Sequence, residues 1–210
     1  MSEARKLRIL VIGASGTLGR AIVDELKPRH EIITAGSKSG DVRIDIADAA
    51  SIVAGLAAAG PLDAVACAAG SANFKPLSAF APASLTDSLY RLGLESKLMG
   101  QVNLTLAARD HLRDGGSITL ITGILADEPI VYGTSLSMVN GAVEAFARAA
   151  AIELPRGLRI NVVSPTVFAE SMEGYGPYFR GFEPTPVARA ARAFSRSIEG
   201  AQTGQVYKVL

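Results

Sequence analysis

Short apolar segments alternate with helix-like segments along almost the whole sequence, and this alternation constrains the fold more than any other feature. Apolar runs of strand length cover residues 7–12, 31–36, 63–69, 117–122, 158–164 and 205–209. Helix-like segments, several with apolar residues at three- and four-residue steps, cover residues 17–27, 48–59, 94–112, 135–154 and 186–198. This order predicts an α/β fold, a doubly wound parallel sheet with helices on both faces. No linker interrupts it, so we expect one domain over residues 1–210.

Charge and cysteine content exclude several classes of protein. The 21 Lys and Arg residues balance 20 Asp and Glu, which argues against a nucleic-acid surface or a polybasic membrane anchor. Cys67 is the one cysteine, and His30 and His111 are the two histidines, so neither a disulfide nor a metal site is expected. No apolar run reaches the ~18 residues of a spanning helix, and the stretch 1–8 is polar rather than leader-like. We expect a cytoplasmic protein that binds no nucleic acid, membrane or metal.

A glycine-rich turn connects the first predicted strand to the first predicted helix. In such a turn, glycines let the backbone N–H groups at a helix N-terminus approach a diphosphate. The position of the turn favours a three-layer, Rossmann-type dinucleotide-binding fold, although glycines can also serve only close helix–strand packing. The candidate cofactor-binding residues in this turn are Gly13, Ser15, Gly16, Thr17, Leu18 and Gly19.

The end of the second predicted strand bears on the choice between NAD and NADP. An acid there holds the ribose 2′-hydroxyl of NAD, whereas a cation accommodates the 2′-phosphate of NADP. Here Ser37 and Lys38 follow Gly36, and the first carboxylate comes only at Asp41. We therefore expect NADP(H) rather than NAD(H), with an ordinary polar turn as the alternative.

Several segments, in order, resemble the short-chain dehydrogenase/reductase family. The glycine turn resembles that of the family but carries Thr17 where the middle glycine is usual. Asp45-Ile46 is similar to the family's acidic–hydrophobic pair beside the adenine, and Ala69-Gly70 is similar to the end of its Asn-Asn-Ala-Gly segment. The resemblance implies that these four residues contact a nicotinamide dinucleotide.

The later part of the chain continues this resemblance. Residues 159–165 are similar to the strand that leads into the nicotinamide site, and Thr203-Gly204-Gln205 resembles the entry to the last strand. The resemblance implies cofactor contacts at Pro165 and Val167. It also implies hydride transfer to or from a small carbonyl or alcohol.

The family's catalytic set of Asn, Ser, Tyr and Lys is altered at every position. Asn140 stands where the Lys is expected, and Leu136, four residues earlier, stands where the Tyr is expected. Lys97 stands where the Asn is expected, and Thr122 lies beside Gly123 at the position of the Ser. We expect Thr122 to stand in for the substrate-orienting hydroxyl.

We interpret these changes as an exchange of roles. Lys97 would supply the ammonium from the long helix, and Asn140 would act as a neutral hydrogen-bonding group. The alternative is a surface charge and a buried amide. The missing phenol would come from Tyr132 in the loop 127–134, unless that residue is only a packed aromatic.

Two functions are compatible with this site. The first is an NADP(H)-dependent oxidoreductase with a non-standard proton relay, and the second is a catalytically inactive NADP(H)-binding sensor or regulatory protein. Residues 170–181 combine aromatic side chains with glycines, as a lid over an apolar substrate would, although they can equally cover core or a partner chain. The resemblance implies a homodimer or homotetramer paired through the helices 94–112 and 135–154.

Overall fold

The computed structural model describes residues 5–210, so part of the polar stretch 1–8 lies outside the described residues. The described strands are β1 (Arg8–Ile12), β2 (Glu31–Gly36), β3 (Val42–Arg43), β4 (Leu62–Cys67), β5 (Leu112–Ile121), β6 (Arg159–Pro165) and β7 (Val206–Val209). All neighbours pair in parallel, in the order β3-β2-β1-β4-β5-β6-β7. The chain winds outward from β1 in one direction and then from β4 in the other, which confirms the doubly wound parallel sheet.

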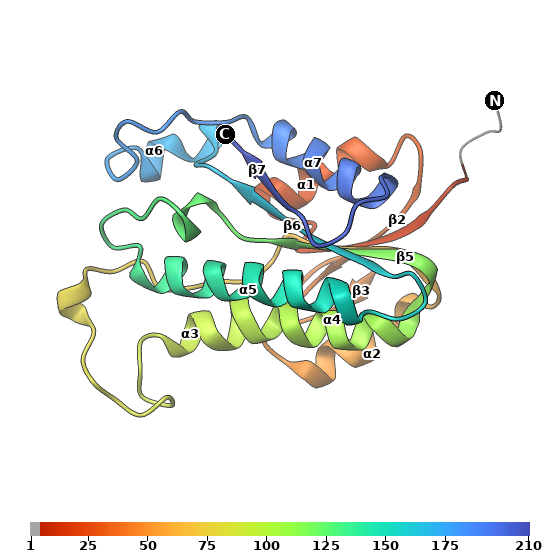
Figure 1. Cartoon of the computed structure of the whole chain (residues 1–210), viewed down its shortest axis with the longest axis horizontal. Coiled ribbons are helices and arrows are strands. Elements are labelled where there is room, and N and C mark those ends of the chain that lie inside the picture. Colours follow the sequence, from red (N-terminus) through yellow and green to blue (C-terminus); the bar gives the residue numbers. More distant parts are fainter. Residues whose placement is uncertain (1–4) are drawn as a thin grey trace.

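Helices cover both faces of this sheet. They are α1 (Thr17–Leu26), α2 (Ala49–Ala59), α3 (Arg91–Gly93), α4 (Gly100–His111), α5 (Thr134–Glu153), α6 (Met172–Tyr175) and α7 (Val187–Glu199). Shorter segments are η1 (Leu77–Ala79), η3 (Ile124–Ala126), η4 (Ala169–Ser171) and the π-helical η2 (Leu94–Met99). Figure 1 shows α2, α4 and α5 on one face and α1 and α7 on the other, so the three-layer arrangement is confirmed. Within residues 5–210, no helix combines the length and apolar character needed to cross a bilayer.

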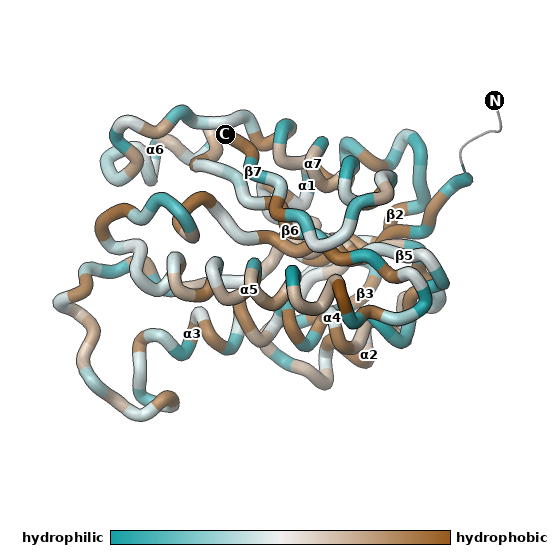
Figure 2. The backbone as a smooth tube through the Cα atoms, viewed as in Figure 1, coloured by the Kyte–Doolittle hydropathy of each residue, from teal (hydrophilic) through white to brown (hydrophobic). Residues whose placement is uncertain are grey.

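The core lies on both faces of the sheet. On β1, Leu10 and Ile12 pack into the cluster under α2, α4 and α5, whereas Ile9 and Val11 pack into the cluster under α1 and α7. A strand covered on both faces needs apolar side chains at every position, which is why these strands are continuous apolar runs in the sequence. Figure 2 shows the hydrophobic residues concentrated along the central strands.

Local capping determines both ends of α2. The carboxylate of Asp48 accepts a hydrogen bond from the backbone N–H of Ala50 at 2.9 Å. Gly60 ends the helix with a φ of +71°, in the left-handed region that favours glycine.

The predicted boundary between the helix 94–112 and the strand 117–122 is wrong. The segment begins as the π-helical η2, α4 ends at His111, and β5 begins directly at Leu112. Leu112 is buried and pairs with Leu62, and the ladder resumes at Ser117 after a shift in register. The polar and glycine residues at 113–116 concealed this early start, and β3 was missed because it has only two residues.

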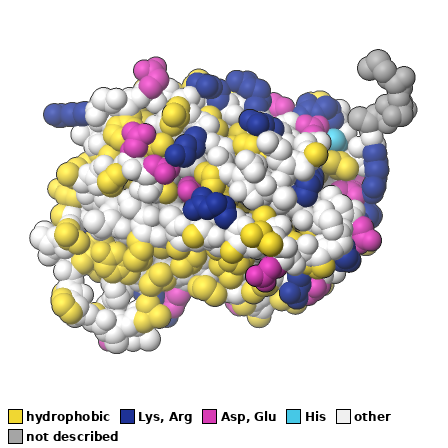
Figure 3. Space-filling view, viewed as in Figure 1, with side chains coloured by type: hydrophobic (Ala, Val, Ile, Leu, Met, Phe, Trp, Pro, Cys, Tyr) yellow, Lys and Arg dark blue, Asp and Glu magenta, His cyan; other side chains and the backbone are white. Residues whose placement is uncertain are grey.

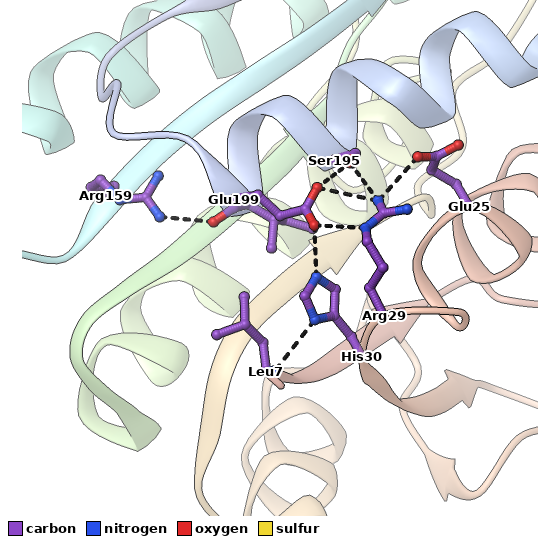
Figure 4. Close-up of polar contacts among 8 residues, drawn as sticks. Leu7, Glu25, Arg29, His30, Arg159, Ser195 and Glu199 are labelled. Atoms are coloured by element: carbon purple, nitrogen blue, oxygen red, sulfur yellow. Dashed lines mark hydrogen bonds and ion pairs between the residues drawn. The ribbon is translucent and has the colours of Figure 1, made fainter. Parts of the chain in front are cut away.

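A polar network joins α7 to α1 and to the loop between α1 and β2, at the amino ends of the strands (Figure 4). Glu199 accepts hydrogen bonds from Arg29 Nε at 2.9 Å, from the Ser195 hydroxyl and from His30 Nε2 at 2.9 Å. His30 Nδ1 accepts from the backbone N–H of Leu7, so Nε2 carries the proton. Burial alone would raise the pKa of Glu199, but these hydrogen bonds lower the pKa to about 2. The network is distant in the fold from the carboxyl ends of the strands, where ligands of such sheets bind.

Candidate active site

The glycine turn is a tight cradle that larger residues do not fit. Gly13 has a φ of +80°, and a Cβ there would lie 2.7 Å from the carbonyl oxygen of Ala68. A Cβ at Gly19 would lie 2.0 Å from the carbonyl oxygen of Gly13. Gly16 is the N-cap of α1 and offers no side chain to the first helical N–H groups. Those N–H groups therefore remain available to an anion at the helix N-terminus.

A cleft of about 330 Å³, which we call the glycine-turn cleft, opens beside this turn. It brings together many of the predicted cofactor residues, namely Gly13, Ser15, Ser37, Lys38, Asp45, Ile46, Ala69 and Gly70. Gly16 and Thr17 are exposed at the start of α1, whereas Leu18 and Gly19 are buried behind it. Pro165 and Val167 line a second pocket instead.

The acid nearest to the end of β2 is engaged elsewhere. Asp41 accepts hydrogen bonds from the backbone N–H and the hydroxyl of Thr34, both at 2.8 Å, and these bonds lower the pKa of its carboxyl. Asp41 is absent from the lining of the glycine-turn cleft, whereas Ser37 and Lys38 line it with exposed side chains.

The second pocket, which we call the apolar pocket, has a volume of about 300 Å³. Its polar side chains are Lys97, Thr122, Asn140, Thr166 and Ser171. The remaining lining residues are Phe74, Gly123, Ile124, Leu125, Leu136, Pro165, Val167, Phe168, Tyr175 and Phe179. The structure thus brings Lys97, Thr122 and Asn140 to one pocket, with Leu136 in the wall.

Gly70 and Lys97, one residue from the lining of each cavity, lie in contact. Gly70, in the lining of the glycine-turn cleft, has a φ of +118°, and a Cβ there would lie 3.0 Å from the Cα of Lys97. Lys97 in turn lines the apolar pocket. The lining of the glycine-turn cleft includes residues that follow β1, β2 and β4, and that of the apolar pocket includes residues that follow β5 and β6, so both cavities lie beyond the carboxyl ends of the strands.

Lys97 is buried rather than being a surface charge. Its side chain sits on the π-helical η2 and is 7% exposed. Burial lowers the pKa of Lys97 to about 8, and burial raises the pKa of the nearby Cys67 thiol to about 11. Gln101 holds this segment against β5 through hydrogen bonds to the carbonyl oxygens of Lys97 and Ile121.

Thr122 has a partner that the sequence did not reveal. Its hydroxyl donates a hydrogen bond of 2.9 Å to the buried carboxylate of Glu144. Glu144 lies one turn after Asn140 on α5. This four-residue spacing, which puts both side chains on one helix face, was the feature of the sequence that could have placed Glu144 near the site. Because the Thr122 proton is committed to Glu144, the hydroxyl presents an acceptor to the pocket.

The side-chain amide of Asn140 is buried, and only one of its two polar atoms forms a hydrogen bond within the described residues. Its Nδ2 lies 3.4 Å from the carbonyl oxygen of Gly123, to which it donates a hydrogen bond. Its Oδ1 is buried without a hydrogen-bond partner among the described residues. A buried acceptor of this kind is costly unless a ligand supplies the donor.

The predicted Tyr132 lies outside the lining of the apolar pocket. Its ring packs against Phe74 at 5.8 Å and against Tyr178 at 5.4 Å between centroids. Tyr175, one of the aromatic residues of the predicted lid, lines the pocket and packs against Phe74 at 5.9 Å. The acid–base role of Tyr132 therefore remains a prediction, and Tyr175 is a phenol that sequence reasoning did not single out.

Residues 5–210 contain no group of three or more His, Cys, Asp or Glu side chains arranged to hold a metal ion.

Comparisons with known proteins identify the family. A family model described as enoyl-(acyl carrier protein) reductase matches residues 16–209. The solved structure of the protein lin1944 from Listeria innocua is 50% identical with a TM-score of 0.93, covering 97% of this chain and 100% of that chain. An uncharacterized oxidoreductase of Methylorubrum extorquens is 31% identical over 139 residues, which are 64% of this chain and 54% of that relative. The match thus spans about half the length of that curated relative.

A more distant structure shares the fold. A small-chain dehydrogenase, solved in complex with NADPH, is 22% identical with a TM-score of 0.83 and covers 98% of this chain and 97% of that chain. With the family model matched from the glycine turn to the last strand, this chain belongs to the short-chain dehydrogenase/reductase family of oxidoreductases.

Proposed function

We propose that this protein is an NADP(H)-dependent oxidoreductase that transfers a hydride to or from a small apolar carbonyl or alcohol. The observation that carries the proposal is the contact between Gly70, which lines the glycine-turn cleft, and Lys97, which lines the apolar pocket. A dinucleotide has two nucleotide halves, and a substrate needs a water-poor space beside the reactive one. The two neighbouring cavities would provide a place for each.

The residues of the glycine-turn cleft fit a dinucleotide. Gly13 and Gly19 leave room that a Cβ would fill, and the open N-terminus of α1 suits a diphosphate. Asp45 and Ile46 would hold the adenosine half, while Pro165 and Val167 would hold the nicotinamide half. The related small-chain dehydrogenase with bound NADPH supports this use of the fold.

The residues that follow β2 favour NADP(H), which carries a 2′-phosphate, over NAD(H). Lys38 and Ser37 are exposed in the cleft and would face a 2′-phosphate, while Asp41 is bound to Thr34 and absent from the cleft lining. An ammonium and a hydroxyl suit a phosphate, whereas a ribose hydroxyl is better held by a free carboxylate.

The side chains of the apolar pocket would orient the substrate while the bound nicotinamide supplies or accepts the hydride. Lys97 brings a positive charge that stabilises negative charge developing on the reacting oxygen. Thr122 accepts a hydrogen bond from a substrate hydroxyl, because its own proton goes to Glu144.

The reacting oxygen also needs a group that exchanges its proton. Tyr175 lines the apolar pocket, whereas Tyr132 lies outside the lining and packs on Phe74. We therefore place the proton exchange at the hydroxyl of Tyr175 in preference to that of Tyr132. The surrounding aromatic rings keep water from the reacting atoms.

Calorimetric titration with both nicotinamide cofactors tests the proposal. NADP(H) is expected to bind more tightly than NAD(H), and Lys38→Asp is expected to weaken NADP(H) binding by roughly tenfold, through loss of a charge-assisted hydrogen bond of about 1.5 kcal/mol. The matched control is Lys75→Asp, which reverses the charge of an exposed lysine outside the cleft lining.

The outcomes separate the two parts of the proposal. An absence of binding heat with either cofactor, oxidised or reduced, would end the proposed function. Equal affinities for NAD(H) and NADP(H) would end only the cofactor preference.

A further inference from the structure

Lys97 brings a positive charge into the wall of the apolar pocket, and the pocket itself does not balance it. The side chain is 7% exposed, and the ion pairs found among residues 5–210 do not include it. The described lining of the pocket contains no carboxylate. A buried charge without a partner costs several kcal/mol, on the order of what one ion pair can return. The site is therefore complementary to an anion.

Neither Cys67, which lies near Lys97, nor Glu144, which lies behind Thr122, supplies that anion. Burial raises the pKa of the Cys67 thiol to about 11, so this thiol is neutral at physiological pH. Glu144, the buried carboxyl group on α5, accepts a hydrogen bond from the Thr122 hydroxyl, and its Oε2 lies 3.9 Å from Arg148 Nη1. Both of its oxygens therefore face other partners. The counter-charge for Lys97 must come with a bound molecule.

The other lining residues of the apolar pocket indicate the size and polarity of the uncharged part of that molecule. Its walls are mainly aliphatic and aromatic, with Leu125, Leu136, Val167 and Phe179 among them. The volume of about 300 Å³ is at the small end of the range for ligand pockets. A compact hydrophobic group fills such a space favourably, and a polar body would lose its hydration there.

We infer that the substrate is a small apolar oxo acid or hydroxy acid, whose carboxylate pairs with the Lys97 ammonium while its hydrophobic body fills the pocket. The inference rests on the proposed function and names the substrate class of the same site. The ammonium has three N–H donors, so it can bind a carboxylate oxygen and a neighbouring reacting oxygen together. A bound carboxylate would also offset the burial that lowers the pKa of Lys97 to about 8.

A matched pair of ligands tests this inference on the protein saturated with NADP⁺. Phenylacetate and its neutral isostere phenylacetamide are titrated separately by calorimetry at neutral pH. Phenylacetate is expected to bind at least about tenfold more tightly, because only the carboxylate forms the charge-assisted pair. Both titrations are also repeated without cofactor, so that the preference for phenylacetate over phenylacetamide is measured independently of cofactor binding.

Variants then assign the preference to one residue. Lys97→Met, which keeps the length of the side chain without its charge, is expected to abolish the preference for phenylacetate. Lys97→Arg is expected to retain part of the preference. The control Lys75→Met removes an equal charge from an exposed position outside the pocket lining and is expected to leave the preference unchanged.

Three results would overturn the inference. The first is equal affinity of wild-type protein for the acid and the amide, and the second is no binding of phenylacetate at millimolar concentration. The third is a Lys97→Met variant that keeps the carboxylate preference but binds NADP(H) more weakly, which would assign the ammonium to the cofactor. In each case the cofactor titration of the same preparation shows separately whether the proposed function stands.

Discussion

At the scale of single residues, Lys97 shows a conflict between folding and function. Its pKa falls from 10.5 to about 8 because burial disfavours the charged form. Between these values the unfolded chain holds a proton that the folded chain has released, so stability rises with pH in that window. Below about pH 8 both states are protonated, and the full penalty of burying the ammonium is present.

Removal of this charge is therefore expected to stabilise the fold. We predict that Lys97→Met raises the free energy of unfolding at neutral pH by about 3 kcal/mol, from roughly 1.4 kcal/mol per pKa unit. The gain should shrink as the pH rises from 8 and should disappear above pH 10.5. Urea unfolding at several pH values measures it, with the exposed Lys75→Met as the control. A loss of stability in Lys97→Met at neutral pH would show that the native ammonium has a partner.

At the scale of elements, Gly19 near the start of α1 and Gly141 within α5 differ in the space around them. A Cβ at Gly19 would overlap the carbonyl oxygen of Gly13, and so the turn could not keep its shape. At Gly141, within α5, a Cβ would meet no atom within 4 Å. The first glycine belongs to the proposed ligand cradle, and the second lies within a helix with open space beside it.

The same substitution should thus have opposite effects at the two positions. Gly19→Ala is expected to cost roughly 1–3 kcal/mol of stability and to abolish NADP(H) binding, because the turn must open. Gly141→Ala is expected to stabilise the protein by roughly 0.5–1 kcal/mol and to leave cofactor affinity unchanged. Thermal unfolding and cofactor titration measure both effects. Unimpaired NADP(H) binding by Gly19→Ala would remove the glycine turn from the proposed site.

At the scale of the whole molecule, α4 and α5 present apolar side chains to the outside. Leu106 on α4 is 48% exposed and Ile152 on α5 is 87% exposed. A groove of about 520 Å³ between these helices is lined by Leu106, Phe146 and Ala150, among others. Figure 3 shows hydrophobic side chains gathered over this side of the molecule. Burying this surface in a second copy is favourable and agrees with the predicted homodimer or homotetramer.

Light scattering at micromolar concentration tests that self-association. The wild-type chain is expected to have the mass of a dimer or tetramer, and Leu106→Asp is expected to shift it toward the monomer by placing a charge in the contact. Leu77→Asp is the matched control, because Leu77 is 64% exposed on η1, away from both helices. A monomeric wild-type chain would contradict the prediction.

The sequence by itself determined the layered sheet, the glycine turn and the family. Strand and helix periodicity, the Asp48 cap and the glycine turn depend on residues close together in the chain, so local physics is enough to predict them. Prediction failed at Leu112, whose strand begins because a distant residue, Leu62, pairs with it. The place of Lys97 in the family pattern stays a prediction from the sequence.

Only the tertiary structure decided how the candidate site is assembled. It buried Lys97 without a partner among the described residues, gave Thr122 the carboxylate of Glu144, and brought Tyr175 rather than Tyr132 to the pocket lining. Each of these facts depends on segments far apart in the sequence meeting at the carboxyl edge of the sheet. Burial and pairing are properties of that packed arrangement, and no local pattern encodes them.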